Sequence, residues 1–175
     1  MSSSRNARGA FPIAREGTKL LLDTSAVIGF LEEIDGAGLL RQLDRLGYEL
    51  LVCAPVDTEV LRPSTRSRMA GVPELGPAGP PDPDELARLK ARYPRLGAGE
   101  LGVLAHGLQL KHAGKPYLCV LDDKRARAAA GDLELQFTGC VGLVRLLQTN
   151  QVLSPSEAED LVGRLVAGGF RYKGS

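Results

Sequence analysis

The sequence predicts an α/β protein: a three-layer α/β/α sandwich around a central parallel sheet of four to five strands. Short apolar runs typical of buried strands alternate along the chain with segments whose apolar residues recur at helical spacing. Strands joined by helices favour a parallel sheet covered on both faces. The 175 residues suffice for one domain with a substantial core, and 43% hydrophobic and 25% charged residues are ordinary for a globular protein.

The chain begins with a segment of low apolar content. Residues 1–17 are rich in Ser, Arg and Gly, so we predict a flexible N-terminal leader followed by one domain at 18–173. Residues 20–22 are all leucine and predict a strand buried on both faces. Thr24 and Ser25 are then expected to cap a helix.

The next elements follow the same alternation. Leucines at helical spacing predict a helix at 36–46, and a second apolar run predicts a strand at 48–53. Pro55 suits the first turn of another helix. Residues 62–96 are less regular, and we interpret them as an insertion containing a Pro- and Gly-rich loop at 71–83 and a short exposed helix.

Strands and helices are also predicted to alternate in the second half of the chain, and the sequence contains no internal repeat. Ser154, with Glu157 three residues later and Pro155 between them, is a typical helix start. We expect strands at 117–121 and 133–137, and helices at 84–92, 99–114, 124–130, 139–147 and 154–168.

Charge and cysteine content exclude several classes of protein. The net charge of +1 gives no overall basic character, so nucleic-acid binding would depend on local patches. The three cysteines, Cys53, Cys119 and Cys140, lack the spacing of a zinc site and suit buried, reduced thiols. Membrane-span and signal-peptide patterns are missing, so we predict a soluble, cytoplasmic protein with no membrane partner.

Acidic residues at strand and helix ends form the main candidate site. Asp23 and Asp122 directly follow apolar strands, and the carboxyl ends of parallel strands meet at one edge of a sheet. Glu59 and Glu100 lie in or near first helical turns, and Asp123 follows Asp122. Carboxylates without partnering His or Cys favour Mg²⁺ or Mn²⁺, and such ions activate water at a phosphodiester in two-metal nucleases.

Structural roles are the alternative for each of these residues. Asp23 or a member of the Asp122–Asp123 pair could cap the following helix, and Glu100 could complement a helix dipole. Glu59 could form a surface ion pair with Arg62.

Basic residues directly follow the aspartate pair. Lys124, Arg125 and Arg127 could neutralise a nucleic-acid backbone or decorate a solvated helix, and we take Arg125 and Arg127 as candidate contacts to substrate phosphates. Aromatic residues make up only 5% of the chain, which argues against a base-stacking platform. His106 and His112 are expected at the surface or its boundary.

These residues together resemble the PIN domain family of metal-dependent nucleases, which includes toxin ribonucleases of toxin–antitoxin pairs. The resemblance covers residues 19–172 and is carried by five segments. They are Leu-Leu-Asp-Thr-Ser-Ala-Val-Ile (21–28), Ala-Pro-Val-Asp-Thr-Glu-Val (54–60), Gly-Ala-Gly-Glu-Leu-Gly-Val-Leu-Ala (97–105), Leu-Asp-Asp-Lys-Arg-Ala-Arg (121–127), and the tail from Thr138-Gly139 to Gly169-Phe170.

The resemblance implies a Mg²⁺- or Mn²⁺-dependent endoribonuclease acting on RNA. Asp23, Glu100 and Asp122 would bind the metal, with Glu59 and Asp123 as supporting catalytic residues. A role as the toxin of a toxin–antitoxin pair, with an antitoxin partner and a homodimer, is implied by the resemblance alone.

Two positions depart from the family pattern. Ala98 replaces the first acidic residue of a Gly-Glu-Ala-Glu-type segment, and Cys140 stands where Thr is common. Both favour an alternative, a non-catalytic PIN-like module that binds RNA or protein. A nucleotide-binding Rossmann protein is disfavoured because no GxGxxG or Walker loop follows the first strand.

Overall fold

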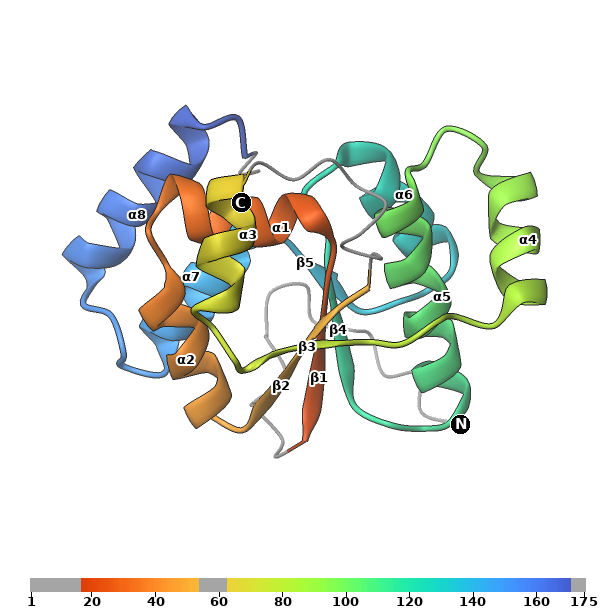
Figure 1. Ribbon diagram of the computed structural model, residues 1–175, viewed down its shortest axis with the longest axis horizontal. Helices are drawn as coiled ribbons and strands as arrows, with labels where there is room; N and C mark the ends of the chain where they lie inside the picture. The colour runs from red at the N-terminus through yellow and green to blue at the C-terminus, as the bar shows by residue number, and fades with distance from the viewer. Residues whose placement is uncertain (1–16, 54–62, 171–175) are drawn as a thin grey trace, which may run out of the picture.

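A computed structural model, described here for residues 17–53 and 63–170, confirms the α/β class and the parallel sheet (Figure 1). Within the described residues, five parallel strands form one sheet in the order β3-β2-β1-β4-β5. The strands are β1 (Thr18–Leu22), β2 (Tyr48–Val52), β3 (Leu75–Pro77), β4 (Tyr117–Val120) and β5 (Phe137–Thr138).

Helices cover both faces of the sheet (Figure 1). On one side lie α1 (Thr24–Ile28), the π-helical turn η1 (Gly29–Glu33), α2 (Ala37–Arg45), α3 (Pro63–Ala70), α7 (Cys140–Thr149) and α8 (Pro155–Ala167). On the other side lie α4 (Pro83–Arg92), α5 (Ala98–His112) and α6 (Lys124–Asp132). Among these helices, none combines the length and the apolar character needed to cross a membrane.

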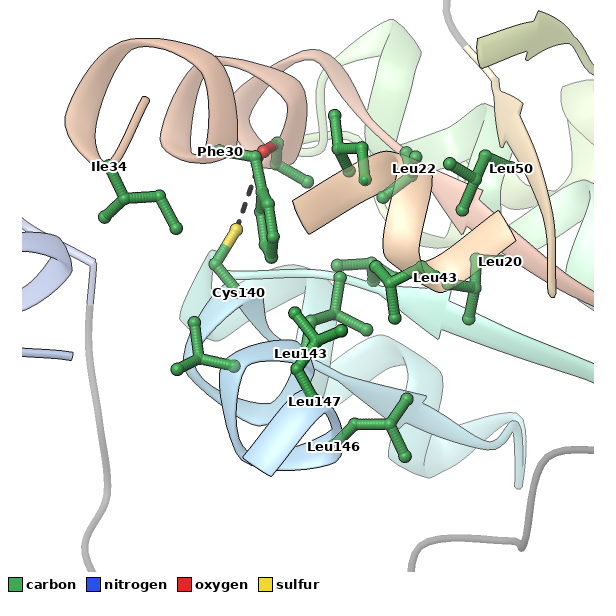
Figure 2. Close-up of a cluster of buried hydrophobic side chains, with 14 of the residues drawn as sticks. Leu20, Leu22, Phe30, Ile34, Leu43, Leu50, Cys140, Leu143, Leu146 and Leu147 are labelled. Carbon is green, nitrogen blue, oxygen red and sulfur yellow. Dashed lines mark hydrogen bonds between the residues drawn. The ribbon is translucent and has the colours of Figure 1, made fainter. Parts of the chain in front are cut away.

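The central strand β1 contributes to the hydrophobic core on both faces of the sheet. Leu20 and Leu22 belong to the cluster beneath α1, α2, α7 and α8, whereas Leu21 belongs to the cluster beneath α5 and α6. This division follows from the alternation of side chains along a strand. Figure 2 shows the first cluster, in which Phe30 packs with Leu143 and other leucines. Burying one such side chain contributes about 1.5–3 kcal/mol.

The order of the strands fixes where a site can form. The chain adds β2 and β3 on one side of β1 and then returns to add β4 and β5 on the other. Leu22 of β1 pairs with both Val52 of β2 and Val120 of β4, so these three strands end side by side. The reversal of direction between β1 and β4 is the position at which open α/β sheets bind ligands.

Several predicted boundaries are wrong, each for a local reason. Residues 71–83 are not all loop, because Leu75 pairs with Leu50 and makes β3 an edge strand. Residues 133–136 are not strand, because α6 runs to Asp132 and Glu134 adopts a left-handed conformation (φ 53°). The first helix is capped by Asp23 rather than by Thr24 or Ser25. The leader 1–16 and the helix expected after Pro55 lie outside the described residues.

Candidate functional site

Asp23 ends β1 and begins α1. Its Oδ1 accepts hydrogen bonds from the Ala26 amide (2.8 Å) and the Ser25 hydroxyl (3.0 Å), which makes it the N-cap of α1. The residue is only 3% exposed. The pKa of Asp23 is raised to about 6, mainly by burial and also by the negative charges of Asp122 and Glu100, while the two hydrogen bonds act in the opposite direction.

Asp122 is the second residue after β4, the strand that pairs with β1. Its Oδ1 accepts a hydrogen bond from the Cys140 amide (2.8 Å), and its Oδ2 accepts one from the Cys140 thiol (2.9 Å). Burial raises the pKa of Asp122, although both Cys140 bonds and the charge of Arg127 act in the opposite direction. Burial also raises the pKa of the Cys140 thiol well above its usual value, so this thiol stays protonated and donates to the carboxylate.

The other predicted acidic residues have mixed placements. Glu100 completes a capping box at the start of α5, where its Oε2 accepts from the Gly97 amide (2.9 Å), and its charge still reaches Asp23. Asp123 is exposed and caps α6 through the amides of Arg125 (2.7 Å) and Ala126 (3.1 Å). Glu59 lies outside the described residues.

Two arginines with the same sequence-based prediction have different surroundings. The Arg127 guanidinium lies over the Phe137 ring, with its Cζ 5.4 Å from the ring centroid, and it lowers the pKa of Asp122. Gly139 makes room for this arrangement: a Cβ there would lie 2.7 Å from Asp122 Oδ1 and 3.0 Å from Arg127. Arg125, in contrast, is exposed and lines a pocket.

A histidine on α5 corrects a further prediction. His106, expected at the surface or its boundary, is buried, and its Nε2 lies 3.1 Å from the Gly79 carbonyl oxygen. Burial lowers the pKa of His106. This contact ties α5 to the segment that follows β3.

The donor atoms near Asp23 suit a hard divalent cation. The described part of the chain contains no group of three or more His, Cys, Asp or Glu side chains placed to hold a metal ion. Mg²⁺, however, is usually bound by one or two carboxylates together with water and phosphate oxygens. An ionised carboxylate has about four lone-pair sites, and Asp23 and Asp122 each accept two hydrogen bonds from their neighbours. Both carboxylates therefore keep capacity for such an ion.

Sequence reasoning missed the partners that orient these groups. The sequence predicts Cys140 as a buried thiol and a departure from a family pattern, but it gives no sign that this residue supplies both donors to Asp122. Phe170 was noted only as part of a closing motif, yet it lines the pocket beside Asp122. For both residues the sequence shows only a position in a family motif. Their roles depend on contacts between distant parts of the chain, which form only when it folds.

The fold and the site define a parallel α/β protein with acidic residues at the carboxyl ends of its central strands. The family model DUF3368, described as a PIN domain, matches residues 19–175, so this chain belongs to the PIN domain family. Comparison with curated proteins and with solved structures finds no significant match.

Proposed function

We propose that this PIN domain is a Mg²⁺- or Mn²⁺-dependent endonuclease that hydrolyses RNA. The observation that carries the proposal is a pair of carboxylates, the buried Asp23 and the half-buried Asp122, at the ends of adjacent strands where the sheet order reverses. Burial raises the pKa of both groups, so neither is in a favourable position as an isolated anion. A bound divalent cation would relieve that cost.

We assign Asp23, Asp122 and Glu100 to the metal, with Glu59 and Asp123 in supporting roles. In the described structure these three carboxylates are not placed as a ready three-residue site, so the proposal gives Asp23 and Asp122 the main part, together with water and phosphate oxygens. When bound, the ion supplies a low-pKa water for attack on phosphorus and stabilises charge on the leaving oxygen. The chain's own contribution is to fix the carboxylates. Ser25 and the start of α1 hold Asp23, and Cys140 holds both oxygens of Asp122.

Arg125 and Arg127 are the residues that we propose for the substrate backbone. Arg125 is exposed and available to a phosphate. Arg127 is held against Phe137 and close to Asp122, which places its positive charge at the edge of the site.

A non-catalytic PIN-like module that binds RNA or protein is the second candidate. It is favoured by Ala98, which leaves Glu100 as the acidic residue of that segment, and by Cys140, which donates one hydrogen bond to each oxygen of Asp122. The toxin role, with an antitoxin partner and a homodimer, is a further proposal that rests on family membership.

The test is cleavage of matched RNA and DNA pools, each with Mn²⁺ or EDTA. We expect the wild type to cleave RNA only with Mn²⁺, and Asp23→Asn to be inactive because it removes the charge and keeps the shape. Asp132→Asn, which removes an exposed carboxylate at the far end of α6, is the control. RNA binding without cleavage would support the second candidate, and equal activity in Asp23→Asn would reject the assignment of the site.

A further inference from the structure

A pocket of about 620 Å³ lies beside Asp122, within the range of roughly 300–1,000 Å³ that is usual for small-ligand sites. Three helix ends form it: the start of α1, the start of α6 and the end of α8. In Figure 1 these three helix ends all lie in the upper part of the molecule. The lining residues are Ser25, 122–125 and 168–170.

The two cations of this pocket have fewer contacts with the rest of the protein than its two aspartates have. Lys124 and Arg125 are exposed, and among the described residues neither forms an ion pair or stacks on an aromatic ring. Asp123 accepts two amide hydrogen bonds from α6, and Asp122 accepts two hydrogen bonds from Cys140. An anion entering the pocket would therefore meet two cations without such partners.

The position of these two cations on α6 is electrostatically unfavourable when no ligand is bound. Lys124 and Arg125 are the first two residues of α6, at the positive end of the helix dipole, where acidic side chains are normally preferred. Places where a local rule is broken are expected at functional sites. A phosphate group would satisfy the dipole and both cations together.

The far side of the pocket offers an aromatic ring. Phe170 is half-buried, and its amide donates to the Leu165 carbonyl (2.9 Å) just past the end of α8. Its ring lies against Gly29, where a Cβ would approach Phe170 Cε1 to 2.7 Å. Gly29 thus allows the Phe170 ring to pack closely on η1, and Phe170 also lines the pocket. A single ring of this kind can stack one base.

We propose that this pocket binds one nucleotide of the substrate strand, with its phosphate on Lys124 and Arg125 and its base on Phe170. The inference rests on the proposed nuclease function, because it places one nucleotide directly beside the carboxylates of that site. Low aromatic content argues against a long stacking platform, and a one-nucleotide pocket needs only this ring.

The test uses two probes, adenosine 5′-monophosphate and inorganic phosphate, titrated into the full chain in EDTA and followed by ligand-observed NMR. We expect the nucleotide to bind more tightly than phosphate. The Lys124→Gln/Arg125→Gln variant should bind both probes at least about tenfold more weakly, roughly the loss of one charge-assisted hydrogen bond. The matched control, Arg88→Gln/Lys90→Gln, removes the same two charges from α4 and should bind as the wild type does.

Phe170→Leu tests the base contact separately from the phosphate contact. It should weaken nucleotide binding and leave phosphate binding unchanged, with thermal unfolding confirming that the variant is folded. Equal binding of nucleotide and phosphate would reject the base contact. Absent binding, or binding unaffected by Lys124→Gln/Arg125→Gln, would reject the pocket. Because EDTA removes divalent ions, this result is independent of the Mn²⁺ cleavage assay, and either proposal can fail without the other.

Discussion

Asp23 combines a structural contact with a charge that opposes folding. Its Oδ1 caps α1, which an uncharged amide oxygen can also do. Its negative charge, in contrast, is buried beside Asp122 and Glu100, and burial is the largest cause of its raised pKa. A cap therefore explains the oxygen at this position but does not explain the charge.

We predict that Asp23→Asn stabilises the metal-free protein at pH 7.5. The pKa is about 6 in the folded state and 3.8 in the unfolded reference, so the ionised group costs up to about 3 kcal/mol of unfolding free energy. The folded state takes up a proton first as pH falls. The wild type therefore recovers this stability between about pH 6 and pH 4, and the advantage of the variant should shrink over that window.

Chemical denaturation at several pH values measures this difference. Asp132→Asn serves as the control, since Asp132 is exposed at the end of α6. A variant that is less stable than the wild type at pH 7.5, or an advantage that is independent of pH, would contradict the electrostatic explanation.

Cys140 orients Asp122 through a donor that a serine can replace. We predict that Cys140→Ser keeps Mn²⁺ affinity close to the wild type and that Cys140→Ala lowers it about 10- to 100-fold, as is usual when a group that orients a metal ligand is lost. Cys119→Ala is the control, because Cys119 is equally buried but contacts the Val103 carbonyl instead. If Cys140→Ala bound Mn²⁺ as tightly as Cys140→Ser, the thiol contact (2.9 Å) would have no role in positioning.

The site residues differ in how far the sequence could locate them. Asp23 and Asp122 were predictable because each follows an apolar run, and the register of β1 with β4 brings those ends together. The different surroundings of Arg125 and Arg127 were not predictable. They depend on Phe137 and Gly139, which only the folded chain places beside Arg127.

At the scale of elements, local signals predicted most helices and the central strands. Residues 154–157 form the expected capping box of α8, and α4 begins at Pro83 after an aspartate cap. The elements that were missed have weak local signals. Helix α3 exposes most of its residues, and its Thr65 and Arg68 bond to η1. Strand β3 contains a glycine and a proline and exists because β2 offers it an edge.

Helix α5 approaches the end of β2 closely, and this approach depends on a glycine. A Cβ at Gly102 would lie 2.5 Å from the Cys53 carbonyl oxygen. We predict that Gly102→Ala destabilises the protein by about 1–3 kcal/mol because α5 must move away from the sheet. Gly163→Ala in α8, where a Cβ meets nothing within 4 Å, should stabilise it by about 0.5–1 kcal/mol.

Thermal and chemical unfolding should both show that Gly102→Ala lowers the free energy of unfolding and that Gly163→Ala raises it. The comparison is matched, since both glycines lie inside helices and both changes add one methyl group. A stabilising Gly102→Ala would show that α5 is not held against Cys53.

At the scale of the whole molecule, the topology does the most to create the site. The chain builds β1 to β3 in one direction and then returns to place β4 beside β1. Asp23 and Asp122, which are 99 positions apart in the sequence, thereby reach the same edge. The PIN family membership and this placement agree, and together they make the carboxylate pair the centre of the proposed function.

The most direct test of that claim is isothermal titration calorimetry of Mn²⁺ into the wild type, Asp23→Asn and Asp132→Asn. A site built on Asp23 predicts saturable Mn²⁺ binding to the wild type and to Asp132→Asn, and its loss in Asp23→Asn, with all three proteins folded. Equal Mn²⁺ binding by the wild type and Asp23→Asn would contradict the account, since the ion would then be held without the carboxylate at the end of β1.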